Sequence, residues 1–454
     1  MEVPFRQDVV DGILADLNIK HIGEATIRQA VAVSKRLEEA TGQSFIHFEI
    51  GAPGIPASQI GVEAQKAALD KGVANIYPDI NGIPELKNAA SRFVKAFLNV
   101  DVAPSGCVPS VGSMMGVLGS FILCRHLYKE RDTILFINPG FPVQPLQAKM
   151  LGYNRVDFDI YDYRGEKLYA KLDEMLSSGK IAAIIYSNPN NPSWVCLTEK
   201  ELEYIGTLAT KYDTIVLEDL AYLCMDVRTN KGIPFQAPYQ PSVAHYTDNY
   251  ILMLSGSKIF SYAGERIAVT AMSDKLAKRS FDYLQEEWGM KTAGDAMVYI
   301  VTYALSSGVC HSAQYALAAM YEAACDGRLN FVEDTRLYAI RAERVKEIFV
   351  RNGFHIVYDK DLDTDISDGF FFTMGRKGFT GNELLAELLR YGISAISLKS
   401  TGSRQEGIRV CTSKVAESDY AVLDERLRSR WYVPRSVPWW LSIFRLATIR
   451  VTRR

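Results

Sequence analysis

Short apolar runs alternate with segments of helical periodicity along the first two thirds of the chain. The helical segments carry their apolar residues on one face, as in 62–70, 84–98 and 198–212. The runs between them are apolar at consecutive positions, which is typical of strands buried on both faces of a parallel sheet. These runs are 133–137, 181–186, 214–218, 250–254 and 267–271. The alternation predicts an α/β fold, in which a mostly parallel sheet has helices on both faces.

From about residue 330 the pattern changes to short strand-like runs around one helical segment, which predicts a smaller α+β domain. We therefore expect four parts: an N-terminal helical segment that belongs with the small domain (1–50), a large domain (51–325), the small domain (326–430) and a basic aromatic tail (431–454). From Arg426 onward the chain contains eight arginines and no acidic residue. Such an end either packs on its own domain or a partner, or lies as a basic amphipathic segment at a membrane interface.

Composition narrows the classes of function. The formal net charge is −2, which gives no electrostatic reason to expect nucleic acid or a membrane as partner. The apolar runs are shorter than the roughly 18–20 residues that a membrane span needs. Seven dispersed cysteines without a Cys-x-x-Cys pair indicate reduced thiols, and no signal-peptide pattern opens the chain, so we expect a cytoplasmic protein. The histidines lack metal-ligand spacing, so no metal is expected.

Ligands of α/β sheets bind beyond the carboxyl ends of the strands, so the residues after each apolar run are the candidates for chemistry. The run 250–254 is followed by Ser255, Ser257 and Lys258, with Arg266 eight residues further on. A lysine desolvated at a strand end has a lowered pKa and becomes a Schiff-base nucleophile. The two hydroxyls and the arginine suit a phosphate group. The alternative is a solvated loop with a surface lysine.

The other strand ends carry similar candidates. Asp219 follows 214–218 and is suited to holding a pyridine nitrogen protonated, with Tyr222 three residues later as a hydrogen-bond donor. Asn191, held between prolines after 181–186, offers a second donor. The alternative is that these residues have purely structural roles, as a helix N-cap, a core tyrosine and an Asn-Pro turn.

Two further segments suit a flat, phosphorylated ligand. Gly112 and Ser113 stand at the start of a helical pattern, where free N–H groups and the helix dipole bind anions, and Met114 follows them. Phe141, after 133–137, has the ring needed for stacking on a cofactor. The alternatives are an ordinary serine N-cap and a core phenylalanine.

Taken together, in this order and spacing, the motifs resemble the class I/II aminotransferases of the aspartate aminotransferase superfamily, which are fold type I enzymes dependent on pyridoxal 5′-phosphate (PLP). The resemblance covers roughly 51–409. It rests on Asn191-Pro192, Asp219-x-x-Tyr222, Ser255-x-Ser257-Lys258 with Arg266, and Arg409 within Gly407-Ile408-Arg409-Val410.

The resemblance implies roles for these residues. Lys258 corresponds to the lysine that binds PLP and then moves the Cα proton, and Asp219 to the partner of the pyridine nitrogen. Asn191 and Tyr222 correspond to the donors to the phenolic oxygen, and Phe141 to the stacking ring. Ser113, Ser255, Ser257 and Arg266 correspond to the phosphate-binding group, and Gly112 and Met114 are also expected to bind the cofactor. Arg409 corresponds to the arginine that binds the substrate α-carboxylate, and Gly51 to a glycine whose backbone meets the substrate. Tyr77 corresponds to a tyrosine that reaches the partner's phosphate site, which implies a homodimer.

The implied activity is ping-pong transfer of an amino group between an L-amino acid and a 2-oxo acid. Two departures from the family pattern bear on specificity. Trp194 stands where the family usually has a turn glycine, so we expect the loop to follow another path and the indole to shape the substrate pocket. Met114 stands where a subgroup of aspartate aminotransferases has a lysine for the distal carboxylate. We therefore expect a neutral or aromatic amino donor rather than aspartate, although Lys399 and Arg404 offer an alternative cation for a distal acid.

Two other functions remain open. A PLP-dependent β-lyase or another amino-acid-acting enzyme would share the fold and the site. A non-catalytic PLP-binding sensor domain would share the fold, but only 50 residues precede Gly51, and they contain no basic recognition helix.

Overall fold

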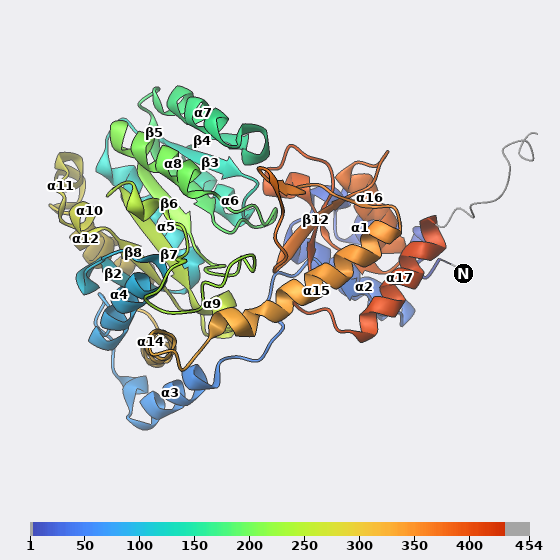
Figure 1. Ribbon diagram of the computed structural model, residues 1–454, viewed down its shortest axis with the longest axis horizontal. Coiled ribbons are helices and arrows are strands. Elements are labelled where there is room, and N and C mark those ends of the chain that lie inside the picture. Colours follow the sequence, from blue (N-terminus) through green and yellow to red (C-terminus); the bar gives the residue numbers. More distant parts are fainter. Residues whose placement is uncertain (1–2, 432–454) are drawn as a thin grey trace, which may run out of the picture.

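A computed structural model describes residues 3–431 of the chain. The chain forms a larger part around a seven-stranded sheet and a smaller part around a four-stranded sheet, joined by one long helix (Figure 1). The order in the larger sheet is β2-β8-β7-β6-β5-β3-β4. Its strands are β2 (Cys107–Ser110), β3 (Thr133–Asn138), β4 (Asn154–Asp159), β5 (Ile181–Ser187), β6 (Ile215–Asp219), β7 (Tyr250–Ser255) and β8 (Ala268–Met272).

The larger sheet is mostly parallel. Strands β4, β3, β5, β6 and β7 pair in parallel, and β8 is antiparallel to both β7 and β2. The five predicted strands are present within one or two residues of the expected positions. Strands β2 and β4 were missed because they lie at the edges: β2 contains Pro109, and β4 carries exposed polar residues at its start.

Helices cover both faces of this sheet, as the alternation of elements predicts. Leu135 and Ile137 of β3 belong to one hydrophobic cluster, while Ile134 and Phe136 belong to the other. The first cluster is covered by α4 (Pro84–Leu98), α7 (Glu166–Leu176), α8 (Glu199–Lys211) and α14 (His311–Cys325); the second by α5 (Gly112–Leu127), α10 (Asp274–Lys278), α11 (Asp282–Trp288) and α12 (Ala293–Ala296). The predicted fold class is confirmed.

The smaller part combines both ends of the described chain. Its sheet has the order β14-β15-β12-β9, formed by β9 (His355–Ile356), β12 (Phe371–Gly375), β14 (Ile396–Ser397) and β15 (Ile408–Cys411). The N-terminal strand β1 (Ile46–His47) pairs in parallel with β13 (Ile393–Ser394). A separate hydrophobic cluster joins residues from Phe5 to Leu427. Around it lie α1 (Gln7–Asp16), α2 (Ile27–Thr41), α16 (Gly381–Arg390) and α17 (Ser418–Trp431).

Helix α15 (Phe331–Arg351) connects the two parts (Figure 1). Phe331 and Tyr338, in its first half, pack in the core of the larger part, while Val345 and Phe349 pack in the core of the smaller part. A hairpin of β10 (Lys360–Asp361) and β11 (Thr364–Asp365) then returns toward the larger part. The helix therefore holds two hydrophobic cores in one continuous element.

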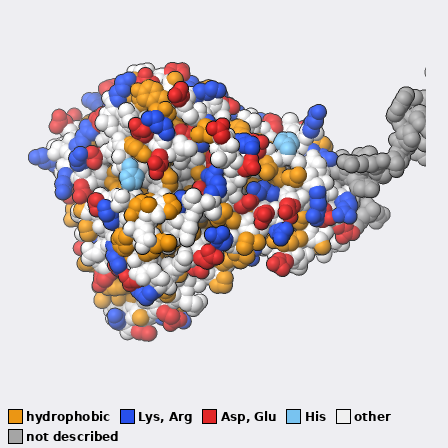
Figure 2. All heavy atoms as spheres, viewed as in Figure 1, with side chains coloured by type: hydrophobic (Ala, Val, Ile, Leu, Met, Phe, Trp, Pro, Cys, Tyr) orange, Lys and Arg blue, Asp and Glu red, His pale blue; other side chains and the backbone are white. Residues whose placement is uncertain are grey.

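The surface mixes charges of both signs across the visible face (Figure 2), in keeping with the small net charge. Within residues 3–431, no helix is long and apolar enough to cross a membrane. The basic aromatic tail predicted for 431–454 lies, apart from its first residue, outside the described residues. Its role and the cytoplasmic location stay predictions.

Candidate active site

The loops after five strands meet at the carboxyl edge of the larger sheet. They carry most of the residues singled out in the sequence: Gly112 after β2, Phe141 after β3, Asn191 after β5, Asp219 at the end of β6, and Lys258 after β7. The loops after β3 and β5 are joined, because the Asn190 amide donates to the carbonyl of Pro139 at 2.8 Å. These two loops are therefore held together at this edge of the sheet.

Lys258 lies in the short helix α9 (Gly256–Ile259), which the Ser255 hydroxyl caps by accepting from the Ser257 N–H at 3.2 Å. Its Nζ donates to the carbonyl oxygen of Gly51 at 2.5 Å and lies 5.4 Å from the centre of the Phe370 ring. Burial lowers the pKa of Lys258 to about 8, and the charges of Arg409 and Arg266 act in the same direction. The partly buried amine thus gains the nucleophilic free-base form near neutral pH.

Asp219 ends β6 with its side chain 7% exposed. Burial raises the pKa of this carboxyl to about 6, while the Ala221 N–H and Gln144, which donate hydrogen bonds at 3.2 and 3.1 Å, oppose the rise. Gln144 lies in α6 (Val143–Met150) and was not identified from the sequence. A polar side chain in the first turn of a helix after a strand end is its only sequence signal.

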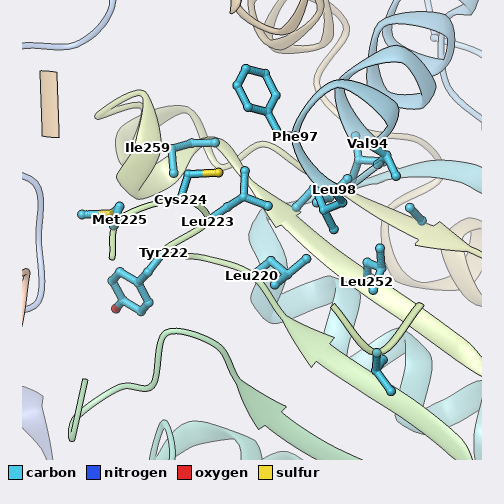
Figure 3. Close-up of a cluster of buried hydrophobic side chains, with 14 of the residues drawn as sticks. Val94, Phe97, Leu98, Leu220, Tyr222, Leu223, Cys224, Met225, Leu252 and Ile259 are labelled. Atoms are coloured by element: carbon cyan, nitrogen blue, oxygen red, sulfur yellow. The ribbon is translucent and has the colours of Figure 1, made fainter. Parts of the chain in front are cut away.

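Tyr222 is almost fully buried at the edge of a hydrophobic cluster. Figure 3 shows its hydroxyl pointing away from the neighbouring apolar side chains Leu220 and Leu223. Burial raises the pKa of this hydroxyl well above its ordinary value, while Arg409 and a hydrogen bond with Asn191 act against the rise. The phenol therefore stays protonated and remains a hydrogen-bond donor at neutral pH.

Arg409 comes from β15 of the smaller part and is 1% exposed. Its Nη1 donates to Asn191 Oδ1 at 3.4 Å and its Nη2 to the carbonyl of Glu49 at 2.5 Å. Its Nε has no hydrogen-bond partner among the described residues. The guanidinium lies over the Phe371 ring, 4.7 Å from its centre. A buried arginine with an unused N–H is equipped to bind a carboxylate.

Gly51 lies against this arginine. A side chain at Gly51 would place its Cβ 3.0 Å from the Phe371 ring and 3.9 Å from Arg409 Nη1. Its carbonyl accepts from Lys258. The glycine therefore leaves space between the lysine and the arginine, on the side that the sequence assigned to substrate.

The first turn of α5 lies beside the Arg266 guanidinium. Gly112 has a left-handed φ of 68°, and a Cβ there would lie 2.5 Å from Arg266 Nη2. Arg266 is itself exposed, with Nη1 donating to the carbonyl of Ala263 at 2.7 Å. Half-buried Ser113 follows in the helix, with its N-terminal N–H groups. The geometry favours a compact anion such as a phosphate group.

Trp194 adopts the left-handed backbone conformation that favours glycine, with a φ of 63°. Whether its loop follows another path than in other members of the family stays a prediction. Hydrogen bonds from Trp194 N to Asn190 O (2.9 Å) and from Asn190 N to Val195 O (3.0 Å) close the turn. The indole is 0% exposed and packs against Tyr222 and Phe371, so it fills space behind the site.

Some predicted residues are not enclosed by this chain alone. Tyr77 is 88% exposed and Met114 is 38% exposed. Phe141 is half-buried between β3 and α6, and Ser257 is half-buried beside Lys258. Phe370 and Phe371, which contact Lys258 and Arg409, were not assigned to the site from the sequence, since they read as part of a buried strand.

The residues present fit PLP. Lys258 supplies the amine, buried Asp219 the carboxylate, and the cradle at Gly112, which a Cβ would fill against Arg266, supplies the phosphate site. The fold and this set of side chains are those of a fold type I PLP-dependent protein. The chain belongs to the family described as Aminotransferase class I and II, whose sequence model matches residues 45–427. The resemblance inferred from the motifs and the PLP cofactor are thereby confirmed.

Known relatives agree with this family. A probable aspartate aminotransferase of Methanocaldococcus jannaschii is 28% identical over 233 residues, which cover 51% of this chain and 58% of that protein. An aromatic-amino-acid aminotransferase of Thermococcus litoralis is 26% identical over 251 residues, covering 54% and 62%. These matches span less than two thirds of either relative. A Thermus thermophilus aspartate aminotransferase double mutant superposes with a TM-score of 0.73 at 17% identity, covering 89% of this chain and 96% of that one.

Proposed function

We propose that this protein is an aminotransferase that moves an amino group between an L-amino acid and a 2-oxo acid in a ping-pong reaction. The observation that carries the proposal is the pair formed by Lys258, whose pKa is lowered to about 8, and the buried Arg409 with an unused N–H. The amine of Lys258 is suited to proton transfer and the guanidinium of Arg409 to binding a carboxylate, and Gly51 lies between them.

The residues divide the work. Arg409 binds the α-carboxylate through its planar guanidinium and so orients the substrate Cα–H bond toward Lys258. The free amine of Lys258 takes the proton from Cα and returns it during transfer. Asp219 would place a negative charge beside the cofactor ring, and Tyr222 and Asn191 would donate hydrogen bonds to the phenolic oxygen of the cofactor. PLP, when bound, supplies the electron sink that stabilises negative charge at Cα.

We further propose a neutral or aromatic amino donor rather than aspartate. Aromatic rings surround the reacting groups: Phe370 faces Lys258, and Phe371 lies under Arg409. Lys399 and Arg404, the cations considered for a distal carboxylate, are both exposed. The similarity to an aromatic-amino-acid aminotransferase is compatible with this preference.

The test is a donor screen on the PLP-loaded protein. We expect an aromatic or neutral L-amino acid to release its 2-oxo acid and to remove the visible absorbance band, and a second 2-oxo acid to restore the band. Pyruvate and ammonia from a cysteine-like donor, with no restored cycle, would instead establish the β-lyase. Binding of amino acids without any product would establish a sensor.

A further inference from the structure

The segment from Asn190 to Cys196 is held by both parts of the molecule. From the smaller part, Asp361 accepts hydrogen bonds from the Cys196 N–H at 3.2 Å to each carboxylate oxygen. From the larger part, Asn190 donates to Pro139 at 2.8 Å. Asn191 and Trp194 lie between these anchors. The position of this segment therefore depends on how the two parts are seated on each other.

Trp194 and Gly369 fit each other closely. A Cβ at Gly369 would lie only 2.1 Å from the indole carbons, a distance that real atoms do not tolerate. Gly369 does not have a positive φ, so the backbone there accepts other residues, and the atoms nearest to an added Cβ all belong to the indole of Trp194. The glycine of the smaller part thus leaves the space that the tryptophan of the larger part fills.

The indole also links the two binding functions of the site. Its ring centre lies 5.4 Å from that of Tyr222 and 6.3 Å from that of Phe371, and these two rings are 5.5 Å apart. Phe371 in turn lies under the Arg409 guanidinium. The packed rings therefore connect Tyr222, the proposed hydrogen-bond donor to the cofactor, with Arg409, the proposed substrate arginine. Such packed, fully buried rings transmit displacements because interiors are close-packed.

We propose that Trp194 is a positioning residue: wedged between Tyr222 and the Gly369–Phe371 segment, it sets Tyr222 and Asn191 relative to Arg409 when the two parts are seated. This inference rests on the proposed aminotransferase function. Trp194 holds its strained left-handed φ although glycine would adopt it without cost, and its Nε1 is buried without a hydrogen-bond partner among the described residues. These costs are offset by the contacts that the indole makes.

Four variants test the proposal: Trp194→Gly, Trp194→Phe, Gly369→Ala and the double variant Trp194→Gly/Gly369→Ala. Trp194→Phe keeps a ring in the gap and is the matched control. We expect Trp194→Gly to lower kcat/KM by roughly 10- to 100-fold, chiefly through a raised KM, because the carboxylate site is displaced from the cofactor site. Gly369→Ala should be damaging alone and tolerated in the Trp194→Gly background, where its methyl group has room.

A spectroscopic readout separates positioning from folding. The pH midpoint of the visible absorbance of the PLP-loaded protein should rise in Trp194→Gly, because displaced Tyr222 and Asn191 no longer favour the ionised phenolic oxygen. Thermal unfolding is measured on every variant.

The outcomes are distinguishable. The inference is overturned if Trp194→Gly unfolds at lower temperature yet keeps the wild-type absorbance midpoint and a kcat/KM within about twofold of wild type. It is also overturned if the effects of Gly369→Ala and Trp194→Gly simply add. If the wild-type protein binds PLP but transfers no amino group, the proposed function fails, while the absorbance midpoint still tests the positioning.

Discussion

At the residue scale, the site keeps two ionisable groups away from water with pKa values shifted in opposite directions. Burial lowers the pKa of Lys258 to about 8 and raises that of Asp219 to about 6. Each shift records a cost of holding the charged form at neutral pH without the cofactor. The protein thus stores unfavourable electrostatics where its cofactor and substrate bind.

Replacing Lys258 tests its central role. Because the amine placed at the Gly51 carbonyl is that of Lys258, we expect Lys258→Ala to lose the visible absorbance of the covalently bound cofactor. Transamination should fall by roughly 10²–10⁴-fold or more, as expected when a general base is removed. Absorbance and steady-state kinetics measure both. A variant that retained the band and turnover would show that another residue carries the cofactor.

Replacing Asp219 by Asn separates activity from stability. The folded chain holds the Asp219 proton more tightly than the unfolded chain, whose carboxyl has a pKa near 3.8. The carboxylate therefore costs the cofactor-free protein stability that grows as pH rises from about 4 to 6 and is present in full above pH 6. We expect Asp219→Asn to raise the free energy of unfolding of the cofactor-free protein at pH 7.5 by on the order of 1–3 kcal/mol.

The same variant should leave stability nearly unchanged at pH 4, where wild-type Asp219 is already protonated in the folded state. Its transamination rate should fall sharply, because the neutral amide gives the pyridine nitrogen no negative charge. Denaturant unfolding at the two pH values is the measurement. Equal changes in the free energy of unfolding at both pH values would mean that burial does not disfavour the charged form of Asp219.

At the element scale, the β10–β11 hairpin fastens the smaller part to the larger one. Asp361 accepts from Arg164 Nη1 at 2.8 Å and from Arg228 Nη2 at 2.9 Å, besides Cys196 N. Arg164 also forms an ion pair with Glu201. Burial acts to raise the pKa of Glu201, but the ion pair and hydrogen bonds from neighbouring N–H groups hold this pKa below its ordinary value. The hairpin thus places the buried carboxylate of Asp361 between Arg164 and Arg228 of the larger part.

Asp361→Asn should destabilise the protein strongly. Removing one charge from a buried network leaves the other charges without compensation, which costs about 3–5 kcal/mol. The same hairpin offers a matched control, since Asp365, 86% exposed, pairs with Lys360 at the surface. We expect Asp365→Asn to leave the free energy of unfolding nearly unchanged, because an exposed ion pair is screened by water. Urea unfolding of both variants is the measurement, and similar losses would contradict the assigned role of the hairpin.

At the scale of the whole molecule, the phosphate side of the site is open. Arg266 is exposed beside Gly112, and Val111 and Met114, which flank the helix start, are 37% and 38% exposed. Tyr77 projects from the surface with 88% of its area exposed. We propose a homodimer in which this surface meets the partner and Tyr77 reaches the partner's phosphate site, since exposed apolar groups beside a functional site are typical of an interface.

Tyr77→Ala tests the homodimer. We expect a dimer in sedimentation for wild type, and an affinity for PLP lowered by roughly 10- to 100-fold in the variant, the range for loss of one hydrogen bond to a charged group. Tyr169→Ala, which changes a 38% exposed tyrosine of α7, is the control. A strictly monomeric wild-type protein that transfers amino groups would rule the homodimer out.

Much of the large sheet could be predicted, because strands buried on both faces must be apolar at consecutive positions. Strands β2 and β4 could not, because these edge strands depart from that pattern: β2 is buried but short and contains Pro109, and β4 begins with exposed polar residues. The same contrast holds in the site. Lys258, Asp219 and Asn191 follow buried strands and are visible as polar residues after apolar runs. Gln144 and Phe370 carry no such signal, since one lies within a helix and the other within a strand-like run.

The sequence by itself determined the alternation of strands and helices and the order of polar residues at the strand ends, since both are local properties of the chain. The lysine and aspartate of the site were found from that order, and the arginine from the resemblance of its motif to the family. Only the tertiary structure decided which residues meet. Gln144 reaches Asp219 across 75 residues, and Asp361 reaches Cys196 across 165. It also decided where the indole of Trp194 lies, because the space for it is left by Gly369, in a different part of the molecule.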